Sequence, residues 1–178
     1  MTEEFEIDQP DSFEPEGGDT FLGRLADLFR SPSSLMDSVG RRPRWWAPGL
    51  LVFFVMIGFT WLVTPISAPE QLELMRDSKI MQMAPEEAWE QQYQEALDIP
   101  TSKLFFQSLT AGFTTWIMVI VFGFILGFFA RMSGGQVRFK QALGIISWSS
   151  IPVFVVASVI KLPLILQTES VYSVSIGL

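Results

Sequence analysis

Residues 47–66 read APGLLVFFVMIGFTWLVTPI and contain no ionisable side chain. A helix rises about 1.5 Å per residue, so roughly 20 such residues cross a hydrocarbon core of about 30 Å. Two further uncharged runs, at 104–130 and 141–160, are also long enough. A soluble domain of 178 residues has too little polar chain to cover three such runs. The sequence therefore predicts an all-α fold, a polytopic transmembrane helical bundle with three spans.

The composition excludes most catalytic chemistry. The chain has no Cys and no His, which removes disulfides, thiolate chemistry and the commonest metal ligand and proton shuttle. Its formal charge of -7 is the wrong sign for binding nucleic acid, which needs clustered Lys and Arg. We therefore expect no catalytic residue, no cofactor, no metal site and no nucleic-acid partner.

Basic residues lie mainly on one side of the predicted spans. The segments before the first span and between the second and third carry Arg24, Arg30, Arg41, Arg42, Arg44, Arg131, Arg138 and Lys140. The link at 67–103 carries only three basic residues, against eight acidic ones. By the positive-inside rule, the N-terminus is cytoplasmic and the link at 67–103 is extracytoplasmic.

The N-terminal part divides into two predicted segments. Residues 1–19 are acidic and rich in Pro and Gly, which predicts a disordered cytoplasmic tail. Residues 20–44 predict interfacial amphipathic helices, the first capped by Asp19 or Thr20 and the second beginning at Pro32. We favour membrane-surface packing with anionic-lipid contact over the docking of a specific partner. The candidate membrane-surface residues are Phe21, Leu25, Leu28, Phe29, Arg41, Arg42, Arg44, Trp45 and Trp46.

The extracytoplasmic link predicts two helices, from Pro69 to about Met81 and from Pro85 to about Leu97, because proline suits a first helical turn. Pro65 is expected to end the first span, because proline inside a helix removes a backbone hydrogen bond. A metal or glycosidase site at the carboxylates of this link is a weaker interpretation than a solvated helix face. Those carboxylates are Glu86, Glu87, Glu90 and Glu95.

Two groups inside the spans are candidate packing or partner interfaces. Gly112, Gly123 and Gly127 permit close helix approach, and we favour internal packing over dimerisation. Pro152 removes a backbone donor and predicts a kink, at which hydroxyls satisfy the freed carbonyl. The neighbouring hydroxyls are Ser147, Ser149 and Ser150. A polar lining for a substrate path is the alternative for this second group.

Four stretches resemble the YIP-domain family, whose members are Rab/Ypt-interacting polytopic membrane proteins. They are FLGRLADLFRSP at 21–32, PRWWAP at 43–48, FKQAL at 139–143 and SWSSIP at 147–152. The resemblance covers about residues 20–165, is to bacterial-type members, and assigns 45–166 to a YIP-like membrane domain. It implies a cytoplasmic N-terminus in a bacterial cytoplasmic (inner) membrane and usually five spans. Residues 167–178 would then be an extracytoplasmic tail or the start of a truncated segment.

Three function classes remain to be weighed. The favoured one is a non-enzymatic membrane scaffold or accessory protein that binds lipids and other integral membrane proteins, with a role in membrane trafficking or beside a transporter. Exporter subunits, a second copy of the chain or, by the family resemblance, a small GTPase are the expected partners. The alternative is a transporter or channel-like subunit moving a small solute or lipid. An intramembrane enzyme lacks a nucleophile or a metal set.

Overall fold

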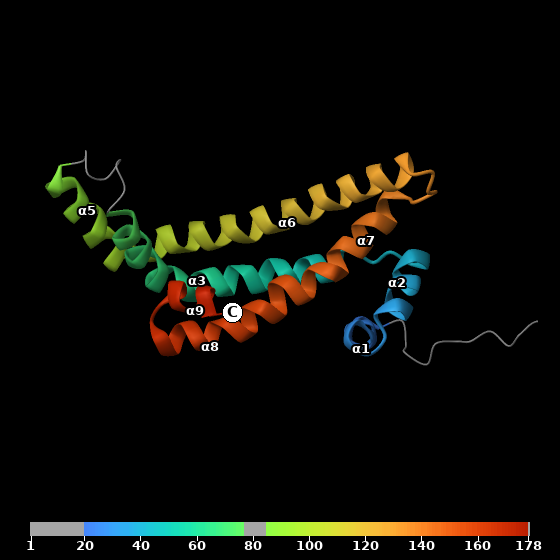
Figure 1. Ribbon diagram of the computed structural model, residues 1–178, viewed down its shortest axis with the longest axis horizontal. Coiled ribbons are helices and arrows are strands. Elements are labelled where there is room, and N and C mark those ends of the chain that lie inside the picture. Colours follow the sequence, from blue (N-terminus) through green and yellow to red (C-terminus); the bar gives the residue numbers. More distant parts are fainter. Residues whose placement is uncertain (1–19, 77–84, 178) are drawn as a thin grey trace, which may run out of the picture. The chain divides into compact units, whose positions relative to one another are not determined.

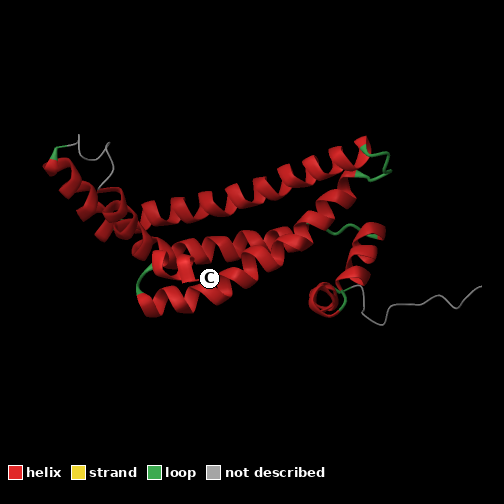
Figure 2. Cartoon of the chain, in the orientation of Figure 1, coloured by secondary structure: helices red, strands yellow, loops and turns green. Residues whose placement is uncertain are grey.

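The computed structural model describes residues 20–76 and 85–177 (Figure 1). Every element in these ranges is a helix, and they contain no strand (Figure 2). The chain divides after Asp37 into two compact units. The predicted acidic tail at 1–19 lies outside the described residues.

Two short helices follow the tail. Helix α1 is Phe21–Arg30 and helix α2 is Pro32–Arg41, in the region predicted to be amphipathic. Thr20 is the N-cap of α1, because its hydroxyl oxygen accepts a hydrogen bond from the Gly23 N–H at 3.2 Å. Helix α1 ends at Arg30, and the Ser31 N–H donates to the Asp27 carbonyl at 2.8 Å.

Three long helical stretches form the second unit. They are α3 (Trp46–Arg76), α6 (Thr101–Met132) and a continuous stretch made of α7 (Phe139–Ser150), η1 (Ile151–Val156) and α8 (Ala157–Thr168). Of the helices that the structure describes, these three are long and apolar enough to cross a membrane. Two shorter helices complete the unit, α5 (Glu86–Leu97) and α9 (Val171–Gly177).

Helix α3 is central to this unit (Figure 1). It packs against α6, α5, α7, η1, α8 and α9, whereas α6 packs mainly against α3 and α7. Val63, Ile165 and Val174 form a buried cluster that joins α3, α8 and α9. One broad side of α6 therefore has no neighbour among the described residues, and its apolar side chains are exposed there.

Close approach of α6 to its neighbours occurs at glycine. A Cβ built at Gly112 would lie 2.7 Å from Ile57 Cγ1 of α3. A Cβ built at Gly123 would lie 3.1 Å from Leu143 Cα of α7, and one at Gly127 3.3 Å from Ala142 Cβ. Because Leu143 Cα belongs to the backbone, it cannot turn aside as a side chain can. The close contacts of α6 with α3 and with α7 therefore require glycine, which has no side chain, at these positions.

The prolines of α3 correct one sequence-based prediction. Helix α3 passes through Pro65 and Pro69 and ends only at Arg76, so Pro65 does not end the helix and Pro69 does not begin a new one. A proline in a membrane helix is tolerated where neighbouring helices and hydroxyls compensate for the lost hydrogen bond. Helix α3 packs against several neighbouring helices, and two hydroxyls near Pro65 bond back to the helix: Thr64 donates to the Thr60 carbonyl at 2.7 Å and Ser67 to the Thr64 carbonyl at 3.4 Å. Met81, the predicted end of that separate helix, lies outside the described residues.

At Pro152, where the sequence predicts a kink, the helix contains a π-helical segment, η1. Proline has no N–H, so the Trp148 carbonyl loses its usual donor. The Ile151 N–H bonds to that carbonyl instead, and Ser150 Oγ donates to the Ser147 carbonyl at 2.7 Å. The helix continues past Lys161 and Pro163 to Thr168, which is beyond the predicted end of the third span.

Replacing Gly123 with Ala should destabilise the bundle by about 1–3 kcal/mol, because the new methyl group presses on the Leu143 backbone. Gly58→Ala is the matched control, since a Cβ there meets nothing within 4 Å. The control should be neutral or stabilising by up to about 1 kcal/mol. Unfolding midpoints in a mild detergent measure both. Equal shifts for the two variants would contradict the packing role of Gly123.

Candidate functional site

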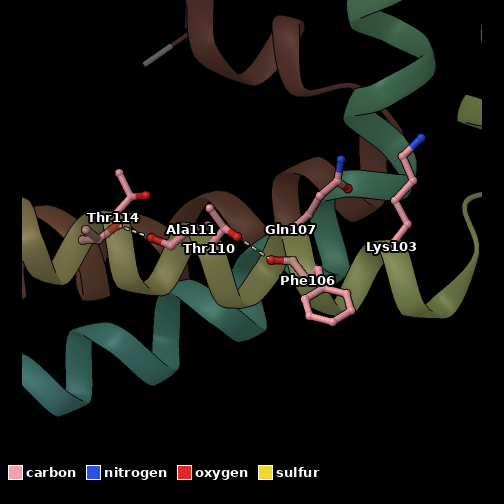
Figure 3. Close-up of a pocket in the computed structure, with 7 residues that line it drawn as sticks. Lys103, Phe106, Gln107, Thr110, Ala111 and Thr114 are labelled. Carbon is pink, nitrogen blue, oxygen red and sulfur yellow. Dashed lines mark hydrogen bonds between the residues drawn. The ribbon is translucent and has the colours of Figure 1, made fainter.

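An open groove of about 760 Å³ runs along the first half of α6, and we call it the α6 groove (Figure 3). All the residues that line it belong to α6. They are Lys103, Phe106, Gln107, Thr110, Ala111, Thr114 and Thr115. The groove is therefore a feature of one helix face.

Four polar residues form a stripe in this groove. Lys103, Gln107, Thr110 and Thr114 are spaced by four, three and four residues, which places them on one helix face. All four are exposed. The last three lie inside the uncharged run at 104–130. A polar stripe on an exposed face of a membrane helix is costly unless another group covers it.

The members of the stripe differ in how their polar atoms are satisfied. Thr110 Oγ1 donates to the Phe106 carbonyl of its own helix at 2.7 Å (Figure 3). Lys103 Nζ lies 3.6 Å from the Glu95 carboxylate in an exposed ion pair. Within the described part of the chain, the Gln107 amide makes no hydrogen bond. The Thr114 hydroxyl likewise makes none. Of these two, the Gln107 amide has the larger demand, because it carries both an acceptor oxygen and an NH₂ donor group.

The residues predicted as interface candidates lie in different surroundings. Gly112 lies against α3, and Gly123 and Gly127 lie against α7. Ser147 and Ser150 are buried, whereas Ser149 and Pro152 are exposed. Among the described residues, the buried Ser147 Oγ has no hydrogen-bond partner. The structure does not bring these residues together on one surface.

The predicted membrane-surface residues of the second unit lie where α3 begins. Trp46 is 57% exposed, and Trp45 stacks on Trp116 of α6 with ring centroids 6.2 Å apart. Arg41, Arg42 and Arg44 are exposed just before them. In α1, the predicted residues divide by exposure. Leu28 is buried, Phe21 and Leu25 are half-buried, and Phe29 is exposed.

The C-terminal end of α3 contacts α5, the helix of the acidic link. Arg76 lies over the Trp89 ring at 4.6 Å from its centroid, and Tyr93 Oη donates to Glu73 at 2.8 Å. These contacts attach α5 to α3, and the hydrogen bond to Glu73 raises the pKa of Tyr93. The carboxylates of Glu86, Glu87, Glu90 and Glu95 are exposed along α5. Within the described residues, no group of three or more acidic side chains could hold a metal ion.

Glu70 of α3 caps α9. Its carboxylate accepts hydrogen bonds from the Ser170 hydroxyl, the Val171 N–H at 2.7 Å and the Tyr172 N–H at 3.1 Å. The chain reverses before this cap at Glu169, whose backbone is left-handed with φ of 50°. A negative side chain at a helix N-terminus satisfies unpaired N–H groups and the helix dipole. Glu70 thereby holds α9 on α3.

Two of these features, the polar stripe of the α6 groove and the Glu70 cap, were not predicted from the sequence. The stripe from Lys103 to Thr114 has a local signal in the sequence, because Gln107, Thr110 and Thr114 are polar residues at helical spacing inside an uncharged span. The Glu70 cap joins positions 100 residues apart and has no local signal.

Three long apolar helices, closely packed at glycine, define a polytopic helical integral membrane protein. The chain matches the family model of the Yip1 domain over residues 26–178 and belongs to that family. The resemblance drawn from the four sequence stretches is thus confirmed. Searches of curated proteins and of solved structures gave no match.

Glu70→Ala should loosen α9, because the Ser170 hydroxyl and two backbone N–H groups lose their acceptor. Loss of a cap costs about 0.5–2 kcal/mol, so the amides of 171–177 should exchange with solvent several-fold faster. Glu73→Ala is the matched control, since it removes the same charge from α3 but leaves α9 capped. Hydrogen exchange read by mass spectrometry makes the comparison. Unchanged exchange in 171–177 for Glu70→Ala would show that the cap is not needed.

Proposed function

We propose that this chain is a non-enzymatic membrane scaffold or accessory protein that binds other integral membrane proteins through the α6 groove. The observation that supports it is the exposed Gln107 amide inside a membrane-spanning helix. Lipid tails have no hydrogen-bonding groups, so they leave this amide unsatisfied. A polar residue on another transmembrane helix can satisfy it.

The size and chemistry of the groove suit a helix. Ala111 provides a small surface between Gln107 and Thr114, which lets a partner helix approach closely. Phe106 supplies an apolar rim at the same level. A hydrogen bond between membrane helices contributes about 0.6–2 kcal/mol, so one amide together with close packing supports specific but reversible association.

The partners we propose are membrane proteins that act in trafficking or in transport. Exporter subunits are one class, and a second copy of the chain is another, since a glutamine amide both donates and accepts. Eukaryotic relatives of the Yip1 domain interact with Rab-type GTPases. A small GTPase is therefore the third class. It would bind the cytoplasmic surface and not the α6 groove, which lies in the half of α6 that follows the extracytoplasmic link.

The transporter alternative has less support. A transport path would be lined by Gly123, Gly127, Ser147, Ser149, Ser150 and Pro152. The two glycines contact α7, and the serines and proline divide between buried and exposed positions. No feature of the described residues favours this function over the scaffold.

We also propose the orientation and compartment of the protein. The N-terminus and the loop at 133–138 would be cytoplasmic, and α5 and α9 extracytoplasmic, in a bacterial inner membrane. The support is the distribution of basic residues along the sequence.

Two single-cysteine variants test this orientation, because the chain has no cysteine of its own. Ser133→Cys places a thiol between α6 and α7, and Gln91→Cys places one on α5. A membrane-impermeant maleimide should label Gln91→Cys in intact spheroplasts and Ser133→Cys only after lysis. The opposite labelling pattern would reverse the orientation.

Photo-crosslinking in the native membrane tests the docking role. A benzophenone amino acid at Thr114 should give a discrete protein adduct that is lost when Gln107→Leu is added, because the partner needs the amide. The same probe at Phe105 is the control, since Phe105 is exposed outside the groove. The mass of the adduct separates a second copy from another protein. An adduct that persists in Gln107→Leu, or equal adducts at both positions, would exclude this docking surface.

A further inference from the structure

Six basic side chains belong to two segments that adjoin each other at the end of the membrane unit where α6 ends and α7 begins. We call them the basic patch. They are Arg41, Arg42, Arg44, Arg131, Arg138 and Lys140, and all of them are exposed. They come from two segments, 38–45 and 131–141, that lie far apart in the sequence. Neither segment contains an acidic residue.

The side chain of Gln141 joins the two segments. Its amide nitrogen donates to the Gly40 carbonyl at 2.7 Å, and its amide oxygen accepts from the Arg138 N–H at 2.8 Å. Gly40 precedes Arg41, and Gln141 follows Lys140. One uncharged side chain therefore joins the two segments that carry the basic residues.

Close packing near Gln141 supports the same arrangement. A Cβ built at Gly144 would lie 2.8 Å from Val39 Cγ1 and 3.4 Å from Pro43 Cβ. The segment that carries Arg41 and Arg44 thus lies directly on α7. The loop after α6 is also held, because Arg131 Nε donates to the Val137 carbonyl at 3.1 Å. The basic patch is therefore an assembled surface rather than two independent charged loops.

The chemistry of the patch suits a phosphodiester. Five of its six members are arginines, whose planar guanidinium groups form paired hydrogen bonds with phosphate oxygens. Trp45 and Trp46 lie beside the patch, and tryptophan favours the level of lipid headgroups. Phe124 and Phe128 of α6 are exposed at 62% and 53%, which provides an apolar surface for acyl chains.

We propose that the basic patch binds an anionic phospholipid through its phosphodiester headgroup. The occupant is a lipid rather than a soluble phosphate, because aromatic and apolar surfaces adjoin the charges. The proposal does not depend on the α6 groove, which is a separate site.

The full chain in a neutral detergent, with bound lipids counted by native mass spectrometry, tests the proposal. The probes are phosphatidylglycerol and phosphatidylcholine with identical acyl chains. The wild type should retain phosphatidylglycerol preferentially. The double variant R138Q/K140Q should lower that preference by about tenfold or more, since each basic residue contributes to headgroup attraction. Arg76→Gln removes a charge elsewhere on the chain and should leave the preference unchanged.

A neutral variant separates an assembled site from diffuse attraction. Gln141→Ala keeps all six basic side chains but removes the amide that joins their segments. It should lower the lipid preference several-fold while the chain elutes and unfolds as the wild type does. An unchanged preference in Gln141→Ala, or in R138Q/K140Q, would overturn the proposal. Competition by soluble glycerophosphoglycerol at equal concentration would also overturn it, because the apolar surface would then contribute nothing.

Discussion

The close approach of α6 to α3 and α7 is the constraint on which the membrane unit depends. In a bilayer, helices gain no hydrophobic energy from association, because lipid tails are as apolar as leucine. Tight packing must supply the attraction, and it requires small residues where backbones meet. Gly112 provides that space towards α3, and Gly123 towards α7. These glycines turn one side of α6 towards α3 and α7. The other side, which includes the α6 groove, therefore remains exposed.

The bilayer environment also determines how the helices tolerate proline. A bilayer offers no water to a carbonyl that loses its donor, so the protein must replace the lost hydrogen bond itself. At Pro152 the Ile151 N–H moves to the Trp148 carbonyl, and Ser150 Oγ compensates the Ser147 carbonyl. This serine has a structural role of its own, independent of any substrate path. By contrast, the exposed Gln107 amide makes no hydrogen bond to the described residues. We therefore propose that a partner helix provides its hydrogen bond.

Much of the fold could be predicted from the sequence, because hydropathy over about 20 residues reports directly on a helix in a bilayer. The three long helices and the cap at Thr20 follow from local pattern. The continuation of α3 past Pro69 could not be predicted, because proline occurs both in the first turn of a helix and inside membrane helices. The bond from Gln141 to Gly40 joins residues 101 positions apart and depends on tertiary packing. The family could be recognised because its motifs are local, whereas the basic patch and the Glu70 cap exist only in the folded chain.

We propose that the α6 groove docks a transmembrane partner through Gln107. The most direct measurement is the mass of the complex extracted with its native lipids in polymer-bounded discs, for the wild type and for Gln107→Leu. Docking through Gln107 predicts a partner at fixed stoichiometry with the wild type and its loss from the variant, while the variant itself stays folded. A single copy of the chain in both samples, or the same complex in both, would contradict it.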